Sequence, residues 1–207
     1  MPSGSSPRGG QSVRILILSS DFEAVLRRLK PEKRLDSLAH REVNDLPFFH
    51  LASSIPEKLL YDSTVYIDNL NKKYPVTSEG VVRASQIWHS SVTEAELLHA
   101  SGRLDPRHPA TAKAIARITQ TLRNRPPYRT IVPDQQIWQE AGVLTGLITR
   151  IRKQEDGIQQ RRLMNDALIF FSALKYGCTV LTRNLSDFDA MQQLVPQGRV
   201  LFYEVRS

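Results

Sequence analysis

A shortage of cysteine removes several classes of protein at once. The 207 residues contain one cysteine, Cys178, so an internal disulfide framework and a cysteine-based zinc site are excluded. No apolar run approaches the roughly 18 residues of a membrane-spanning helix, and no signal-peptide cleavage pattern is present. A P-loop and a GxGxxG sequence are also missing. These absences predict a cytoplasmic protein without membrane contact. The length suits one domain with an appendage.

Positive charge, by contrast, is plentiful and concentrated. The formal net charge is +7, and residues 103–130 hold seven basic side chains against one acid, Asp105. Such a block favours a polyanionic partner, because neutralised phosphates release counterions. A solvated basic helix, or a face that meets an acidic protein, would have the same composition. The predicted RNA-contacting residues are Arg103, Arg107, Lys113, Arg117, Arg123, Arg125 and Arg129.

Hydrophobic patterning divides the chain near residue 57. Residues 1–56 are predicted as an N-terminal extension of unknown role, with about ten disordered residues at its start and short helices over 21–29 and 35–46. Residues 57–207 alternate strands with helices, which predicts an α/β domain with a mostly parallel sheet. The predicted strands are 58–67, 86–92, 129–132, 178–182 and 200–205. The predicted helices are 78–85, 93–101, 109–122, 134–153, 161–176 and 187–194.

Three carboxylates follow or end predicted strands, where ligands bind in parallel sheets. Asp62 stands in an apolar strand near its carboxyl end, and Asp187 follows another strand. Each also has a structural interpretation: Asp62 could cap the next turn, and Asp187 could lie in the first turn of a helix capped by Ser186. Glu96 could close a capping box with Thr93 as the N-cap.

A fourth carboxylate, Asp166, is predicted to be buried. Its neighbours at helical spacing are Leu163, Ile169 and Phe170, so it shares their apolar face. An unpaired buried carboxylate costs several kcal/mol. The structural alternative is therefore an ion pair with an arginine such as Arg183.

If the four acids converge, they form an all-oxygen site without histidine or cysteine. Hard oxygen ligands select Mg²⁺ or Mn²⁺. Such a cluster beside a basic surface is what metal-assisted hydrolysis of a phosphodiester bond requires. The acids predicted to ligate the metal are Asp62, Glu96, Asp166 and Asp187.

The same residues carry a resemblance to PIN domains. Residues 62–68 (DSTVYID) resemble the opening motif of that family, and residues 91–98 (SVTEAELL) resemble its second motif. The third and fourth motifs are similar to residues 166–177 (DALIFFSALKYG) and 181–188 (LTRNLSDF). The four occur in the family's order over about residues 57–205, and the pattern is most similar to VapC-type toxins of toxin–antitoxin modules.

The resemblance implies a three-layer α/β/α fold and a Mg²⁺- or Mn²⁺-dependent endoribonuclease. It implies a catalytic role for the four acids, with Asp62 and Asp166 as the main metal ligands. Ser63 and Thr182 match hydroxyl positions near the site, and Asn184 would orient Asp187 or a metal-bound water. The implied partners are an RNA substrate, a cognate antitoxin and a second copy of the chain. Two alternatives are a non-catalytic RNA-binding module of the same fold and an RNA-processing nuclease without an antitoxin.

Overall fold

A computed structural model describes residues 22–34, 37–39, 41–52, 54–75, 84–153 and 156–205. The helix predicted over 78–85 lies outside the described residues except at its last two positions. Within the described ranges, no helix is both long enough and apolar enough to cross a bilayer.

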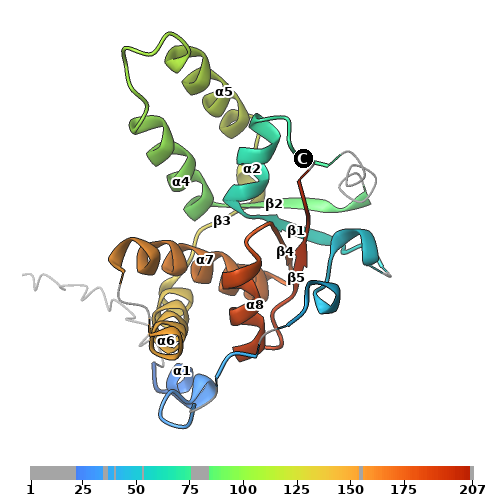
Figure 1. The fold of residues 1–207 in the computed structure, drawn as a ribbon, viewed down its shortest axis with the longest axis vertical. Helices are drawn as coiled ribbons and strands as arrows, with labels where there is room; N and C mark the ends of the chain where they lie inside the picture. Colours follow the sequence, from blue (N-terminus) through green and yellow to red (C-terminus); the bar gives the residue numbers. More distant parts are fainter. Residues whose placement is uncertain are drawn as a thin grey trace, which may run out of the picture.

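A five-stranded parallel sheet forms the centre of the protein (Figure 1). The strand order is β3-β2-β1-β4-β5, and every neighbouring pair is parallel. The predicted parallel α/β sheet is therefore confirmed. The strands are β1 (Lys58–Tyr61), β2 (Gln86–Ser90), β3 (Thr130–Ile131), β4 (Thr179–Thr182) and β5 (Val200–Phe202).

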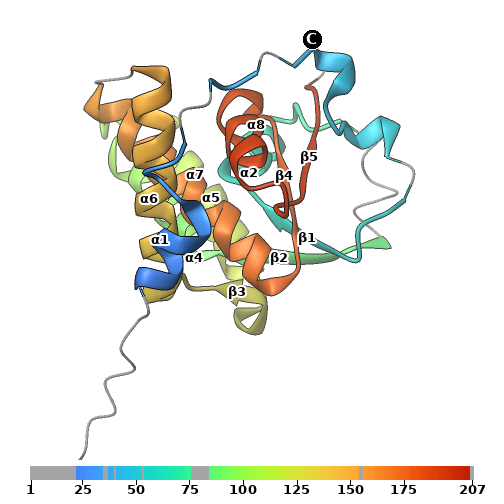
Figure 2. The ribbon, with the colours of Figure 1, turned by 90° about the horizontal axis from the view of Figure 1, so that it is seen from below.

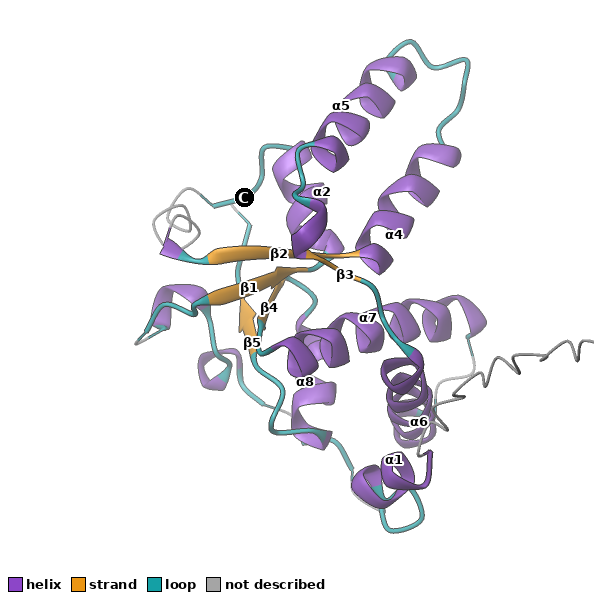
Figure 3. Ribbon diagram, turned by 180° about the vertical axis from the view of Figure 1, so that it is seen from behind, coloured by secondary structure: helices purple, strands orange, loops and turns teal. Residues whose placement is uncertain are grey.

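Helices cover both faces of the sheet, which confirms the three-layer α/β/α architecture (Figure 3). On one face lie α2 (Ser63–Leu70), α4 (Ser91–Gly102) and α5 (Thr111–Arg123). On the other lie α6 (Gln135–Arg152), α7 (Gly157–Tyr176) and α8 (Leu185–Leu194). A single 3-10 turn, η4 (Pro127–Arg129), precedes β3.

Successive side chains along the strands pack alternately into two hydrophobic cores. Leu60 and Val180 belong to the large core under α6 and α7, whereas their neighbours Leu59 and Leu181 belong to a smaller core that contains Val65 of α2. This is the period of two expected for a sheet covered on both faces. The strand predicted over 58–67 is wrong beyond residue 61, because Asp62 ends the strand and caps α2.

The described part of the N-terminal extension packs onto the α/β domain (Figure 2). Helix α1 (Phe22–Leu29) buries Val25 and Leu29 against α6, and Phe48 forms an isolated parallel bridge with Phe202 of β5. The helix predicted over 35–46 is wrong. Among its described residues this stretch has only the 3-10 turn η1 (Val43–Asp45), and a second 3-10 turn, η2 (Phe49–Leu51), follows it. Pro47 disfavours a helical conformation at Leu46, the residue before it.

Candidate functional site

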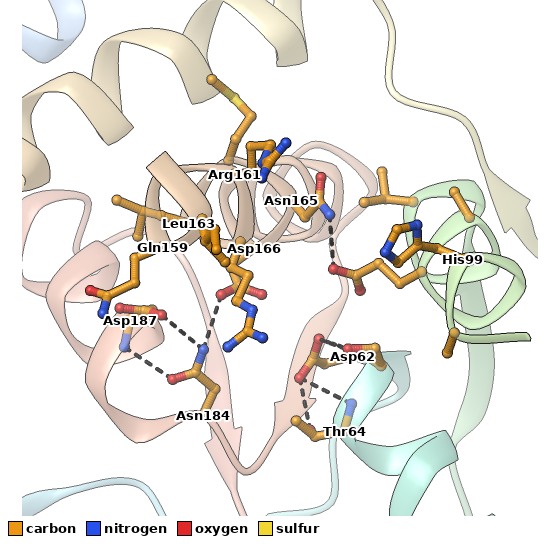
Figure 4. A pocket seen from close by; sticks show the side chains of 18 of the residues that line it. Asp62, Thr64, His99, Gln159, Arg161, Leu163, Asn165, Asp166, Asn184 and Asp187 are labelled. Atoms are coloured by element: carbon orange, nitrogen blue, oxygen red, sulfur yellow. Dashed lines mark hydrogen bonds between the residues drawn. The ribbon is translucent and has the colours of Figure 1, made fainter. Parts of the chain in front are cut away.

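The four predicted acids line one cleft at the carboxyl ends of the strands. Asp62 follows β1, Glu96 lies on α4, Asp166 on α7 and Asp187 on α8. The cleft has a volume of about 1630 Å³. Figure 4 shows Asp62, Asp166 and Asp187 around the same space.

Asp62 is held rigidly at the base of the cleft. It caps α2, where its Oδ1 accepts the backbone N–H of Ser63 at 2.6 Å, so the structural interpretation of this residue is also correct. Its Oδ2 accepts the hydroxyl of Thr64 at 2.7 Å and that of Thr182 at 2.8 Å. Asp62 is 1% exposed. Thr182 and Ser63 thus lie beside it, and Thr64 is a contact that the sequence analysis did not single out.

Glu96 is not part of a capping box. Helix α4 begins at Ser91 and is capped by Ser90, whose hydroxyl accepts the backbone N–H of Val92. Thr93 lies inside the first turn and donates its hydroxyl to the carbonyl of Tyr61. The capping-box interpretation is therefore wrong by one turn, because Ser90, the last residue of β2, already caps the helix.

The Glu96 carboxylate points toward α7 instead. Its Oε1 accepts Asn165 Nδ2 at 2.9 Å, while Oε2 is buried and has no hydrogen-bond partner among the described residues. Burial raises the pKa of Glu96, and the charge of Asp62 raises it further, against the lowering effect of the Asn165 bond. A buried oxygen without a donor is a place where a cation would be stabilised.

Asp166 is buried and carries no ion pair with any described residue. It is 7% exposed, and its Oδ2 accepts Asn184 Nδ2 at 3.0 Å. Burial raises its pKa well above the ordinary value, and repulsion from Asp62, Asp187 and Glu96 adds to the shift. The predicted alternative, an ion pair with Arg183, is wrong, because Arg183 binds a different aspartate.

Asp187 lies in the first turn of α8, and that helix is capped by Asn184 rather than by Ser186. The Asn184 amide donates to Asp187 Oδ2 and to Asp166 Oδ2, both at 3.0 Å, so one side chain spaces two of the acids (Figure 4). The other oxygen, Oδ1, accepts Arg152 Nη1 at 2.5 Å. The same guanidinium donates to the Ser186 carbonyl at 2.6 Å.

The donor chemistry of the cleft fits a hard divalent cation. All four candidate ligands are carboxylates, two of them with raised pKa values, and one buried oxygen lacks a donor. Among the described residues, however, no three acids are already gathered closely enough to form a finished coordination site. The reason is visible in the contacts, since Asp62 is engaged by two hydroxyls and Asp187 by Arg152.

The predicted RNA-contacting residues are dispersed. Only Arg103 lines the cleft. The prediction that Arg125 contacts RNA does not agree with its burial. Arg125 is 7% exposed, stacks 4.0 Å from the ring centroid of Tyr66 and faces Glu94 at 3.5 Å, so its guanidinium is enclosed by protein. Arg117 donates to the carbonyl of Leu70. The remaining predicted contacts lie outside the cleft lining and are Arg107, Lys113, Arg123 and Arg129.

Four other cations do line the cleft, and all come from the corner between α6 and α7. Arg161 and Arg162 were visible in the sequence as a basic pair before Asp166, but Arg152 and Lys153 end a helix whose pattern gives no sign of the cleft. Asn165 is likewise a missed contact, although its place next to Asp166 could have drawn attention to it. These four cations are Arg152, Lys153, Arg161 and Arg162.

Comparisons of the sequence with protein families and with curated proteins give no match. Solved structures do resemble the fold. A chain of the VapBC2 complex from Rickettsia felis, bound to a promoter DNA fragment, matches with a TM-score of 0.51 at 16% identity, over 71% of this chain and 99% of that one. A chain of DNA-bound VapBC from Salmonella typhimurium matches with a TM-score of 0.50 at 18% identity, over 70% and 97%. At 16% and 18% identity the likeness shows the fold alone: this chain has a fold similar to that of a chain in each of these VapBC complexes.

Proposed function

We propose that this protein is an endoribonuclease that depends on Mg²⁺ or Mn²⁺ and acts as the toxin of a toxin–antitoxin pair. One observation carries the nuclease proposal: a buried carboxylate, Asp166, faces three other carboxylates from separate elements and has no ion pair with a described residue. A protein gains nothing in stability from such an arrangement. Perturbed carboxylates gathered in a cleft are typical of a catalytic site.

The residues of the chain have separable tasks in this site. Thr64 and Thr182 fix the orientation of Asp62, and Asn165 turns Glu96 toward the cleft. Asn184 sets the spacing of Asp166 and Asp187. A divalent cation held by these carboxylates would supply the charge that neutralises the scissile phosphate and acidifies water.

The proposed partners follow from the fold. The structural neighbours are VapBC complexes, which supports a small antitoxin as the partner of this chain. A homodimer remains a prediction from the same likeness. The two neighbours named above were solved on DNA, and for this chain we propose that any DNA contact belongs to the complex with the antitoxin.

Cleavage of total cellular RNA by the purified full-length chain tests the nuclease proposal. We expect discrete fragments with Mg²⁺ or Mn²⁺, none with EDTA, and none from Asp166→Asn. The matched control is Asp105→Asn, which makes the same chemical change at an exposed residue outside the cleft and should cleave like the parent.

The outcomes separate the alternatives. Fragments that persist in EDTA or in Asp166→Asn would overturn the assigned site. Metal binding without cleavage, alongside RNA binding, would favour the non-catalytic RNA-binding module. Cleavage without growth arrest on expression in bacteria would favour an RNA-processing nuclease without an antitoxin.

A further inference from the structure

We propose that the sugar–phosphate backbone of single-stranded RNA is held by a cationic rim on the walls of the acidic cleft, and not by the basic residues of α5. The rim consists of Arg103, Lys153, Arg161 and Arg162, which all line the cleft and are all exposed. The proposal rests on the nuclease function above, because it names the surface that delivers the substrate to that site.

Helix α7 carries a gradient of charge along its cleft face. Asp166 lies at the middle of the helix, and Arg162 lies one turn earlier on the same face. At 1.5 Å per residue this places the arginine about 6 Å nearer the start of the helix. Helix α7 leads into β4, so its first turns project beyond the carboxyl edge of the sheet. The acid therefore lies deeper than the arginines.

Helix α4 repeats this gradient on the opposite wall. It starts directly after β2 and leads away from the sheet, with Glu96 in its second turn (Figure 1). Arg103 follows Glu96 by seven residues, which is two turns on the same face and a rise of about 10 Å. On both walls, therefore, carboxylates lie near the floor and guanidinium groups near the mouth.

The rim cations are available to a ligand. Arg103, Lys153, Arg161 and Arg162 make no ion pair within 4 Å with any other described residue, and the charge of Arg162 lowers the pKa of Glu96. Arg152 lines the same cleft but is neutralised by Asp187, so we leave it out of the rim.

The basic residues of α5 are poorly placed for the same task. Lys113 and Arg123 are exposed but do not line the cleft, and Arg117 is engaged by the Leu70 carbonyl. Arg125, just beyond the helix, is enclosed between Tyr66 and Glu94. Sequence charge alone pointed to residues 103–130, but of their basic residues only Arg103, which lies before α5 at the end of α4, lines the cleft.

A flexible polyanion fits this distribution of charge. A phosphate that reaches the floor meets carboxylates, which repel it unless cations are bound there or nearby. Flanking phosphates of the same strand would lie between the two cationic walls, where each contact releases counterions. A stiff duplex cannot lower one phosphate between two helices, whereas a single strand can bend into the cleft.

Binding of an unstructured RNA oligonucleotide at several salt concentrations tests the rim. All proteins carry Asp166→Asn, so that cleavage cannot distort the measurement. Arg161→Gln/Arg162→Gln should weaken binding and reduce the slope of log K against log salt by about 1.4, which is 0.7 for each lost phosphate contact. Arg103→Gln alone should reduce it by about 0.7.

The matched control is Lys113→Gln/Arg123→Gln, which removes the same charge from exposed positions outside the cleft. It should leave the slope within about 0.3 of the parent, on the same scale of 0.7 for one contact. Equal losses in both double variants, or no RNA binding by the parent, would overturn the rim. So would poly-glutamate binding the parent as tightly as RNA, because the surface would then suit an acidic protein.

This measurement is independent of catalysis. If the parent chain without Asp166→Asn cuts no RNA but the rim variants still lose RNA binding selectively, the proposed nuclease activity fails and the rim stands. If the parent chain cuts RNA but the rim variants bind RNA normally, the rim fails and the nuclease proposal stands. A single-stranded DNA of the same sequence serves as the competitor. If the rim contacts only phosphates, this DNA should compete as well as the RNA does.

Discussion

Two buried aspartates of this protein lie in opposite electrostatic surroundings. Asp68, at the far end of the first PIN-like motif, is 2% exposed and receives Arg183 Nε at 2.8 Å and Tyr203 Oη at 2.8 Å. We call these three residues the Asp68 cluster. In the acidic cleft, Asp166 is similarly buried, but its hydrogen bond comes from the neutral amide of Asn184.

The comparison shows that burial of a carboxylate does not by itself indicate its role. In the Asp68 cluster the hydrogen bond to Asp68 raises the pKa of Arg183, so the contact stabilises the charged form of the guanidinium. In the cleft the pKa of Asp166 rises because burial and like charges oppose ionisation. One region uses a carboxylate to hold α2 to the segment after β4, and the other contains a buried carboxylate that has no ion pair with a described residue.

The largest expected effect is on the rate of RNA cleavage when one aspartate of each region is replaced by asparagine. Asp166→Asn removes a charge that would bind the metal, so we expect the rate of RNA cleavage to fall at least about 100-fold. Asp68→Asn, assayed well below its melting temperature, should keep the rate within a few-fold. Initial rates with Mn²⁺ measure both. Similar losses in the two variants would mean that the regions are not functionally distinct.

The same two variants should move stability in opposite directions. Asp68→Asn weakens the bonds from Arg183 and Tyr203, and we expect a loss of about 1 to 3 kcal/mol in the free energy of unfolding. The low end is favoured because the Arg183 side chain is 42% exposed and can be hydrated. Asp166→Asn should stabilise. Urea unfolding at pH 7 in EDTA gives both values, and a destabilised Asp166→Asn would contradict the comparison.

The sequence predicted the floor of the cleft well because chain topology places it. Asp62 and Asp187 each follow a strand, and the carboxyl ends of parallel strands share one edge of the sheet. Helical spacing placed Asp166 on a buried face, and its 7% exposure agrees. The alternation of strands and helices likewise predicted the parallel α/β sheet, whereas the three-layer α/β/α arrangement was implied by the resemblance to PIN domains.

What the sequence could not give is the pairing of charges between distant segments. Arg152 ends α6 and reaches Asp187 across 35 positions of sequence, and no local pattern encodes that contact. The charge of residues 103–130 groups Arg125 with the surface cations, because composition carries no information on burial. The stacking of Arg125 on Tyr66 of α2 depends on how the segment between α5 and η4 packs against that helix. Such contacts are set by tertiary packing, which overrides local charge patterns.

The raised pKa of Asp166 should appear in the pH dependence of the protein's stability. Its folded pKa is raised, so between the unfolded value of about 3.9 and the folded value the native state holds a proton that the unfolded state has lost. Stability therefore falls as pH rises through that window and then levels off, and Glu96 acts in the same direction.

Thermal melting in EDTA from pH 4 to pH 8 measures this dependence. Asp166→Asn should match the parent at the acidic end and melt at a higher temperature at the neutral end. A difference of about 2 to 4 °C corresponds to about 1 kcal/mol for a chain of this length. Parallel pH curves for the two proteins would show that Asp166 ionises normally.

The smallest expected effect concerns Arg152, the residue that makes the cleft partly resemble the Asp68 cluster. Its guanidinium already neutralises Asp187 at 2.5 Å, so a divalent cation has to compete with it for that carboxylate. Arg152→Gln should raise the affinity for Mn²⁺ about three- to tenfold, the size expected from one partly exposed ion pair of about 1 kcal/mol. Arg150→Gln is the matched control, since Arg150 lies on the same helix but donates to the carbonyls of Pro31 and Arg34. Calorimetric titration measures both. Unchanged or weaker Mn²⁺ binding by Arg152→Gln would show that Asp187 does not take part in holding the cation, and the cleft would then offer three carboxylates instead of four.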